Sequence, residues 1–139
     1  IENLCEKVGD KMDGYYAFPT AKQLQKLTIE DFKQMGLGYR APYLYETCRI
    51  IDEVAPKILE QDTNDATKSL LALKGIGPKV ANCILLFGLH KTNAFPVDVW
   101  VKRIMERFYP HGFPHMFNDV AGIAQQYLFY YKRSLENKK

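Results

Sequence analysis

Lys79 follows a glycine-rich turn and stands where an apolar segment begins. The stretch "LKGIGPKVANC" (residues 73–83) places Pro78 where the first turn of a helix tolerates a missing N–H group. The positive end of a helix dipole disfavours a charged amine, and an uncharged amine is a nucleophile. The sequence therefore predicts that Lys79 attacks a carbon atom. The alternative is a lysine that extends into solvent or pairs with a phosphate.

Two more residues share the helix face of this lysine. A helix from about Pro78 to Leu89 places Lys79, Cys83 and Phe87 on one side, because they are four residues apart. A nucleophile, a small thiol and an aromatic ring on one face could form the floor of a pocket for a flat heterocycle. Packing of Cys83 and Phe87 in the core is the alternative.

A carboxylate follows in the segment "AFPVDVW" (residues 94–100). Asp98 is predicted to be the N-cap of a helix over residues 99–109. From this position it could also face Lys79 across a cleft. There it would stabilise positive charge that develops on a sugar, or help to deprotonate the amine.

The turn itself suits the binding of a phosphate. Two short helices joined by "GIG" (residues 75–77) predict a helix–hairpin–helix over about residues 66–89. Glycines allow close approach of a ligand, and the first N–H groups of the second helix lack partners within that helix. The helix dipole adds positive potential at the same place, so a DNA phosphate fits without any base being read. The alternative is a tight connection between helices with no ligand.

The elements that must position these residues are helical throughout. Thr28 and Asp31 predict a capping box for a helix that ends at Gly36, and Asp65 is predicted to cap a short helix over 66–73. Strand patterns are almost absent, so an all-α fold in one domain, residues 1–139, is expected. The further expected helices cover residues 42–60, 78–89, 99–109 and about 118 onward. Residues 1–14 resemble the middle of an amphipathic helix, which suggests a fragment of a longer chain.

Composition restricts the class of protein further. The net charge of +3 permits a nucleic-acid partner. No apolar run has the length of a membrane-spanning helix, and no signal peptide is recognised, so no membrane association is expected. Cys5, Cys48 and Cys83 have no metal-ligand spacing, which argues against a zinc ribbon or an iron–sulfur cluster. An intracellular protein is expected, located in the cytoplasm or nucleoid of a bacterium or in a eukaryotic nucleus.

These motifs together resemble a known family. The segments "LKGIGPKVANCILLFGL" and "AFPVDVWVKRIMERFY" resemble the core of the helix–hairpin–helix DNA glycosylase superfamily. A lysine two residues after the second hairpin glycine marks its bifunctional members. "GLGYRAPYL" (residues 36–44) and "AQQYLF" (residues 124–129) resemble the 8-oxoguanine DNA glycosylase/AP lyase family. The resemblance implies the helical catalytic domain of that family without its N-terminal β-rich domain, and base-excision repair of 8-oxoguanine in duplex DNA.

The resemblance also implies roles for the residues of the pocket. Lys79 matches the nucleophile that forms a Schiff base, and Asp98 matches the catalytic aspartate. The other matching residues would contact the flipped base: Cys83 on one face, Phe87 near the same pocket, Gln125 on the Watson–Crick edge, and Phe129 stacked on the ring.

Further residues are implied to contact DNA. Tyr39 and Arg40 match residues that wedge into the duplex and contact the opposite base, and Gly75 and Gly77 belong to the phosphate-binding hairpin. Trp100 departs from the family pattern, because well-known members have a phosphate-contacting histidine there. Tryptophan can donate one N–H group but carries no charge.

No cofactor is expected to be required. The resemblance implies a structural Na⁺ or K⁺ held by the backbone carbonyls of Leu71, Leu73 and Ile76. The expected partner is double-stranded DNA with an oxidised purine, bound by a monomer. Two alternatives stay open: a non-catalytic DNA-binding module that uses the hairpin only for phosphates, and a glycosylase for another damaged or mismatched base. The sequence does not indicate the preferred base opposite the lesion.

Overall fold

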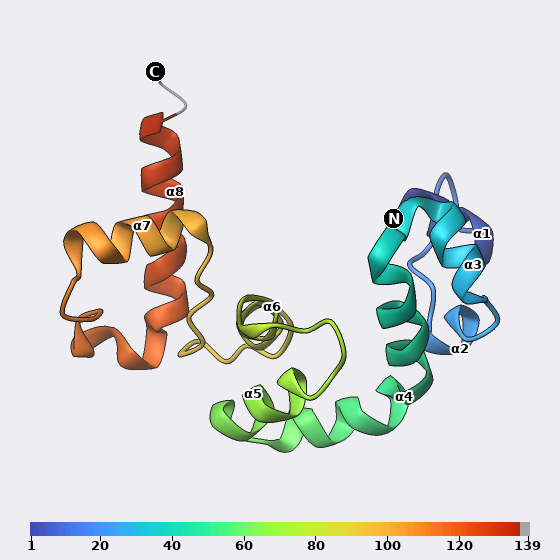
Figure 1. The fold of residues 1–139 in the computed structure, drawn as a ribbon, viewed down its shortest axis with the longest axis horizontal. Helices are drawn as coiled ribbons and strands as arrows, with labels where there is room; N and C mark the ends of the chain where they lie inside the picture. The colour runs from blue at the N-terminus through green and yellow to red at the C-terminus, as the bar shows by residue number, and fades with distance from the viewer. Residues whose placement is uncertain (137–139) are drawn as a thin grey trace. The chain divides into compact units, whose positions relative to one another are not determined.

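The protein folds into helices that form two compact units. The structure is a computed structural model, and it describes residues 1–136. One unit comprises Ile1–Glu60 with Leu73–Gly75, and the other comprises Gln61–Ala72 with the chain from Ile76 onward. Within residues 1–136 there is no strand, only an isolated bridge between Lys11 and Tyr16. The expected all-α fold is confirmed (Figure 1). No helix in this described part has the length and apolar character needed to cross a bilayer.

The first unit is built around the long helix α4. Its helices are α1 (Glu2–Val8), α2 (Ala21–Leu24), α3 (Ile29–Phe32), a π-helical turn (Lys33–Leu37), a 3₁₀ turn (Gly38–Arg40) and α4 (Ala41–Glu60). The buried core consists of apolar residues from all four α-helices and the segments between them: Leu4, Leu24, Leu27, Phe32, Ala41 and Cys48. Both α2 and α3 pack against α4. The amphipathic helix expected over residues 1–14 is shorter than predicted, since α1 ends at Val8.

Side-chain caps fix the short helices of this unit. The capping box predicted for Thr28 and Asp31 is confirmed, with the Asp31 amide donating to Thr28 Oγ1 at 3.1 Å. Asp31 also accepts a hydrogen bond from Lys7 Nζ at 2.6 Å, which joins α3 to α1. The bond from Lys7, followed by the bonds from Thr28, holds the pKa of the Asp31 carboxyl far below its usual range.

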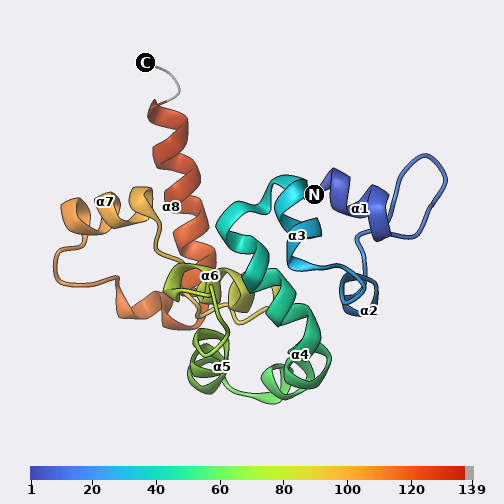
Figure 2. The ribbon, with the colours of Figure 1, turned by 45° about the vertical axis from the view of Figure 1, so that its right-hand side comes forward.

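The second unit contains the predicted hairpin. Its elements are α5 (Thr63–Leu71), α6 (Pro78–Cys83), a π-helical turn (Ile84–Gly88), α7 (Val99–Phe108), a 3₁₀ helix (His115–Val120) and α8 (Ala121–Glu136). Helix α7 crosses α8 in Figure 1 and lies beside it in Figure 2, and the two pack together. Helix α5 packs against α6 and against the turn that follows it.

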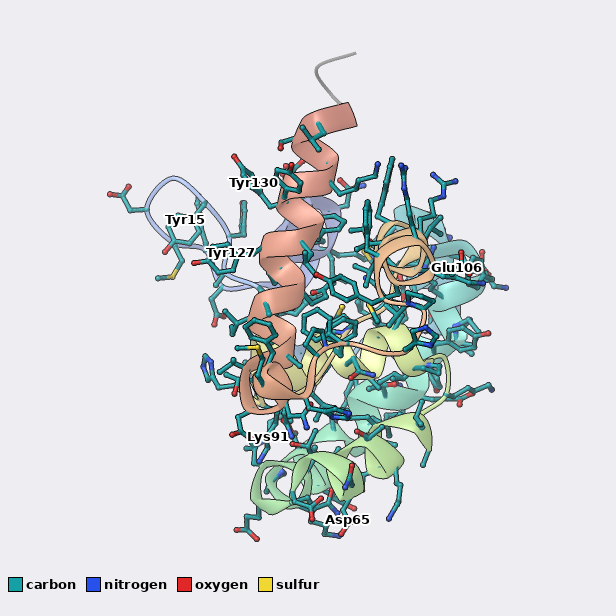
Figure 3. All side chains as sticks on the ribbon, turned by 90° about the vertical axis from the view of Figure 1, so that its left-hand side faces the viewer. Tyr15, Asp65, Lys91, Glu106, Tyr127 and Tyr130 are labelled. Carbon is teal, nitrogen blue, oxygen red and sulfur yellow. The ribbon has the colours of Figure 1, made fainter. Side chains whose placement is uncertain are left out.

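Two predicted boundaries in this unit were wrong. Asp62, not Asp65, is the N-cap of α5: its Oδ1 accepts the Asp65 amide at 2.9 Å. Asp65, labelled in Figure 3, instead lies in the first turn of α5. Its Oδ1 pairs with Lys68 Nζ at 2.8 Å. An aspartate three residues after another aspartate fits either position, so the local pattern was ambiguous.

The other error concerns where the last helix begins, whereas the extent of the helix predicted from about Pro78 to Leu89 is confirmed. The helix predicted over 78–89 is α-helical only to Cys83 and then widens into the π-helical turn. The last helix does not begin near Asn118, because a 3₁₀ segment covers that residue and α8 starts at Ala121. Hydrophobic periodicity does not distinguish these helix types well, since each places every third or fourth side chain on one side.

Candidate functional site

The hairpin turn has the geometry that two glycines allow. Gly75 has φ of +85°, and a Cβ there would lie 2.3 Å from a ring carbon of Tyr43. A side chain at Gly75 is therefore excluded by both backbone conformation and packing. Gly77 is the N-cap of α6, and a Cβ there would meet no atom within 4 Å. Packing within the chain does not demand glycine at this second position, which leaves close approach of a ligand as an explanation.

The side chains after the hairpin line one small cavity of about 160 Å³. All of its lining residues belong to the second unit. Six of them were predicted from the sequence: Lys79, Asp98, Cys83, Phe87, Gln125 and Phe129. Two were not predicted: Pro96 and Gln126.

The amine and the carboxylate of the cavity come from the starts of two helices. Lys79 is exposed in the first turn of α6, directly after Pro78. Asp98 is the N-cap of α7, as predicted, and its Oδ1 accepts the Val101 amide at 2.8 Å. This bond fixes the carboxylate while using one of its two oxygens. The capping interpretation of Asp98 and a chemical role are therefore compatible.

Asn82 ties the helix of Lys79 to the loop that carries Asp98. Its Oδ1 accepts the Phe95 amide at 3.0 Å, while its Nδ2 donates to the Pro78 carbonyl at 2.9 Å. Both bonds come from a single side chain one turn along α6 from Pro78, so the loop and the helix start are held together. The sequence did not predict a role for Asn82, because its partner Phe95 lies thirteen positions away and no local pattern indicates the contact.

Gly122 brings α8 against the same loop. Its amide donates to the Thr92 carbonyl at 2.8 Å, and Thr92 Oγ1 donates to the Asp119 carbonyl at 2.6 Å. A Cβ on Gly122 would lie 2.2 Å from the Ala94 carbonyl oxygen. The close contact requires glycine, and it positions the part of α8 that lines the cavity.

Helix α8 supplies a polar and an aromatic group one turn apart. Gln125 is only 2% exposed and lines the cavity, and Phe129 is half-buried. The amide oxygen of Gln125 accepts a hydrogen bond from Gln126 Nε2 at 2.5 Å. An amine, a carboxylate, an amide and an aromatic ring therefore surround one space, as the predicted binding of a flat heterocycle requires.

Tyr39 and Arg40 belong to the first unit. They follow Gly36 and Gly38, whose φ values of +83° and +52° shape the turn before α4. Tyr39 is 68% exposed, and the Arg40 guanidinium lies 4.5 Å from its ring centroid. This exposed cation–aromatic pair fits contact with a nucleic acid, and its predicted role against the opposite base stays a prediction.

Trp100 has a cationic neighbour. It lies in the first turn of α7, and the Arg103 guanidinium is 5.4 Å from its ring centroid. Trp100 carries no charge, but Arg103 places a positive charge beside it, three residues later on the same helix. The predicted phosphate contact at Trp100 remains a prediction.

The carbonyls predicted to hold a monovalent cation have no competing partner. No turn or capping hydrogen bond of residues 1–136 ends on the carbonyl oxygen of Leu71, Leu73 or Ile76. Carbonyl oxygens are the donors that such a cation needs. Leu73 belongs to the first unit, whereas Leu71 and Ile76 belong to the second, and the predicted cation site stays a prediction. Elsewhere in the described chain, no three His, Cys, Asp or Glu side chains gather as a metal site.

Two larger grooves involve α8. One of about 580 Å³ lies between α8 and the segment 109–120, and one of about 620 Å³ lies between α7 and α8. Their linings are mostly apolar and aromatic, with Tyr127 and Tyr131 among them. Tyr127 and Tyr130 project from α8 and are 76% and 75% exposed (Figure 3). Neither groove contains an amine and a carboxylate together among the described residues. Of these three spaces, the smaller cavity is therefore the better candidate for chemistry.

Comparison of the sequence with known protein families identifies a superfamily for this chain. The sequence profile of the HhH-GPD superfamily, described as base excision DNA repair proteins, matches residues 1–114. The chain therefore belongs to this superfamily. The matched range includes the hairpin, Lys79 and Asp98 but ends before α8, so it does not include Gln125 or Phe129, whose roles stay predictions.

Individual relatives narrow the class. The "Probable N-glycosylase/DNA lyase" of Methanothermobacter thermautotrophicus is 44% identical over 121 residues, covering 76% of this chain and 38% of that protein. The N-glycosylase/DNA lyase of Saccharomyces cerevisiae is 36% identical, covering 77% and 34% respectively. The chain thus spans little more than a third of these curated relatives.

Solved structures agree over nearly the whole chain. The 8-oxoguanine glycosylase/lyase of Clostridium acetobutylicum, in complex with double-stranded DNA containing cytosine opposite 8-oxoG, superposes with a TM-score of 0.86 and 37% identity. The match covers 98% of this chain and 53% of that one. A 3-methyladenine DNA-glycosylase from Archaeoglobus fulgidus also matches, with a TM-score of 0.73, 26% identity and coverage of 94% and 50%.

Proposed function

We propose that the protein containing this chain is a bifunctional DNA glycosylase and AP lyase that removes 8-oxoguanine from duplex DNA. The observation that carries the proposal is the cavity in which Lys79 and Asp98 meet Gln125 and Phe129. A non-catalytic phosphate-binding hairpin has no need of an amine, a carboxylate, an amide and a ring around one space. The relatives named as N-glycosylase/DNA lyases support the same activity.

Binding to DNA would begin at phosphates. The turn at Gly75 and Gly77 leads into the free N–H groups at the start of α6, which suit a phosphodiester. Trp100 and Arg103 would contact a second phosphate through an indole N–H and a guanidinium. Tyr39 and Arg40 would contact the duplex at the base opposite the lesion. A Na⁺ or K⁺ on the carbonyls of the hairpin would add positive charge near a phosphate.

The damaged base would then rotate out of the stack, which costs a few kcal/mol. The flipped purine would stack on Phe129 and lie against Cys83, two side chains of the cavity that are half-buried. Gln125 would form hydrogen bonds with the edge of the base. The buried amide of Gln125 can discriminate between bases. A base that forms no hydrogen bond with it binds more weakly, because the amide is then desolvated without a partner.

Lys79 performs the chemistry in this proposal. Its uncharged Nζ donates an electron pair to C1′ of the deoxyribose while the bond from C1′ to the base nitrogen breaks. The base leaves with that bonding pair and takes a proton, and the new C–N bond becomes an imine once the sugar ring opens. Loss of a proton from C2′ then expels the 3′ phosphate by β-elimination, which cuts the strand on the 3′ side of the lesion.

Asp98 would assist without forming a covalent bond. Positive charge develops on the sugar as the base departs, and a fixed carboxylate stabilises that charge. The oxygen that is not bound to Val101 is available for this role or for taking a proton from the amine. Because the N-cap bond already orients the carboxylate, little reorganisation is needed during the reaction.

Another damaged base is the second candidate substrate. The match to a 3-methyladenine DNA-glycosylase shows that a similar fold occurs in a protein named for a different lesion. The two candidates differ in the hydrogen bonds that Gln125 could form with the base. Activity on duplexes that carry either lesion, compared under one set of conditions, distinguishes them.

A nicking assay tests the proposal directly. The complete natural polypeptide is incubated with a labelled duplex containing 8-oxoguanine, with and without borohydride. We expect strand cleavage, and borohydride should reduce the imine to a stable covalent adduct of protein and DNA. Lys79→Gln should remove both the adduct and the cleavage while DNA binding is retained.

Lys74→Gln is the matched control. Lys74 lies in the same hairpin, is exposed and pairs with Glu46, but does not line the cavity. It should keep the adduct and lose only part of the DNA affinity. An adduct that persists in Lys79→Gln would show that another amine is the nucleophile. Absence of cleavage and adduct in the unaltered protein, with a salt slope about one unit lower in Lys79→Gln, would instead support the non-catalytic module.

A further inference from the structure

Phe113 is the centre of an aromatic cluster that reaches the loop of Asp98. Its ring centroid lies 5.1 Å from that of Phe95, 5.3 Å from that of Tyr109 and 5.6 Å from that of Phe117. Rings at such separations, tilted or edge to face, attract one another beyond the effect of burying their area. The cluster lies within the second unit and joins the end of α7, the 3₁₀ helix before α8 and the loop that carries Asp98.

A tight turn brings Phe113 to this place. The chain leaves α7 at Tyr109, and the Gly112 amide donates to the Tyr109 carbonyl at 3.0 Å. Gly112 has φ of +102°, a conformation that glycine adopts without strain and other residues avoid. Phe113 follows directly, so its ring packs back against Tyr109 and also meets Phe95. The backbone turn therefore sets the position from which Phe113 contacts the loop.

Phe95 transmits this contact to the cavity. Its amide donates to Asn82 Oδ1 at 3.0 Å, so its backbone is tied to α6 while its ring packs on Phe113. The next residue, Pro96, is buried and lines the cavity, and Asp98 is the N-cap of α7 two residues further on. Peptide planes are rigid and proline fixes φ, so a shift of Phe95 also displaces the residues that follow it.

We infer that Phe113 is a positioning residue for the proposed reaction, because its ring holds Phe95 and thereby keeps Asp98 beside the sugar that reacts. The inference depends on the function proposed above. Phe113 does not belong to the lining of the cavity, so it acts through the loop and not through contact with the base. A carboxylate stabilises developing charge well only where it is held in place. The phosphate contact proposed for the hairpin does not involve this loop, so loss of the Phe113 ring should slow excision more than it weakens DNA binding.

The test compares one substitution at two rings of the cluster. Phe113→Leu removes the ring that meets Phe95. Phe117→Leu is the matched control, because Phe117 contacts Phe113 but not Phe95 among the aromatic pairs of the described chain. Both rings are half-buried and line the groove of about 580 Å³ beside α8, so their loss has a similar structural cost. Phe113→Tyr keeps the ring and should retain most of the activity.

Single-turnover excision rates and DNA affinities are measured for the complete natural polypeptide on one duplex that carries 8-oxoguanine. We expect Phe113→Leu to lower the rate on the order of tenfold, since a displacement of about 1 Å costs about 100-fold and a smaller one costs less. Its affinity for DNA should stay close to that of the unaltered protein, and Phe117→Leu should keep most of the rate. Urea unfolding verifies that each variant is folded. If Phe113→Leu is not, Phe113→Met replaces it, because methionine also lacks the ring but fills irregular space.

A double-mutant cycle shows whether Phe113 acts through Phe95. Phe95→Leu alone should slow excision by a similar factor. If the two rings act as one contact, the double variant should be slowed by about tenfold in all, whereas independent effects would multiply to about 100-fold. A merely structural role for Phe113 would not produce this coupling.

The inference is wrong if Phe113→Leu keeps the full rate, or if Phe113→Leu and Phe117→Leu slow excision equally. It is also wrong if the effects of Phe95→Leu and Phe113→Leu multiply, or if Phe113→Leu lowers only the affinity for DNA. A different result, in which the unaltered protein neither excises 8-oxoguanine nor forms the borohydride adduct, overturns the proposed function itself. The two failures are therefore distinguishable.

Discussion

Gly122→Ala should disturb the junction that holds the two halves of the cavity together. A Cβ at this position would lie 2.2 Å from the Ala94 carbonyl oxygen and 2.7 and 3.0 Å from two methyl carbons of Leu86. Ordinary van der Waals contact begins at 3.4 Å, so the backbone of the loop or of α8 must move. Because the interior is close-packed and Leu86 is buried, there is little free space to absorb the added methyl group.

The expected magnitude follows from that overlap. Adding a methyl group to a packed site lowers the free energy of unfolding by about 1–3 kcal/mol. To remove the overlap of the new Cβ with Ala94, the loop that carries Asp98 must also shift by about 1 Å relative to the helix that carries Gln125. A misplacement of this size lowers the rate of a catalysed reaction on the order of 100-fold. We therefore expect both a less stable second unit and slower excision.

Gly88→Ala is the matched control. A Cβ there would meet only a methyl carbon of Ile84 at 4.0 Å, and Gly88 does not have a positive φ. The substitution should leave stability unchanged or raise it by up to about 1 kcal/mol, since alanine restricts the unfolded chain.

Urea unfolding measured by tryptophan fluorescence supplies the test. Trp100 is the single tryptophan and belongs to the second unit, so its emission follows the part of the chain that contains Gly122. Equal unfolding free energies for Gly122→Ala and Gly88→Ala would refute the packing argument. A less stable Gly122→Ala that retains full excision activity would refute the link between this junction and the proposed active site.

Two further substitutions test local interactions. Asn82→Ala removes the acceptor of the half-buried Phe95 amide, so we expect a loss of about 1–3 kcal/mol in stability and slower excision. Asn82→Asp keeps that acceptor but cannot donate to the Pro78 carbonyl, so it should recover only part of the loss, and Asn64→Ala, at an exposed position of α5, should be neutral. Asp31 has a lowered pKa, chiefly through its bond from Lys7, so its stabilising contribution is present above the unfolded-state pKa of about 3.9 and is lost as the pH falls below it. Asp31→Asn should thus flatten the dependence of urea unfolding on pH in this acidic range, measured by circular dichroism, and an unchanged dependence would contradict the assignment.

Local chemistry in the sequence determined much of the candidate site. The four-residue spacing of Lys79, Cys83 and Phe87 placed them on one side, and the structure gathers all three at one cavity, because even a helix that widens after Cys83 preserves that side over two turns. The N-cap positions of Thr28 and Asp98 were also predictable, since a capping side chain bonds to an amide only three residues away. All of these interactions lie within a few positions along the chain.

The tertiary structure decided two kinds of feature. One is the contacts between segments far apart in the sequence, and the other is the choice between two positions that fit the same local pattern. Asp62 and Asp65 both suit an N-cap, and only the folded helix selects Asp62. Asn82 accepts a hydrogen bond from the Phe95 amide in the loop that carries Asp98. Gly122 lies so close to the Ala94 carbonyl oxygen that a residue with a Cβ would not fit. The physical reason is that hydrogen bonds and close contacts between remote segments depend on packing, whereas helical periodicity and capping are set by neighbouring residues.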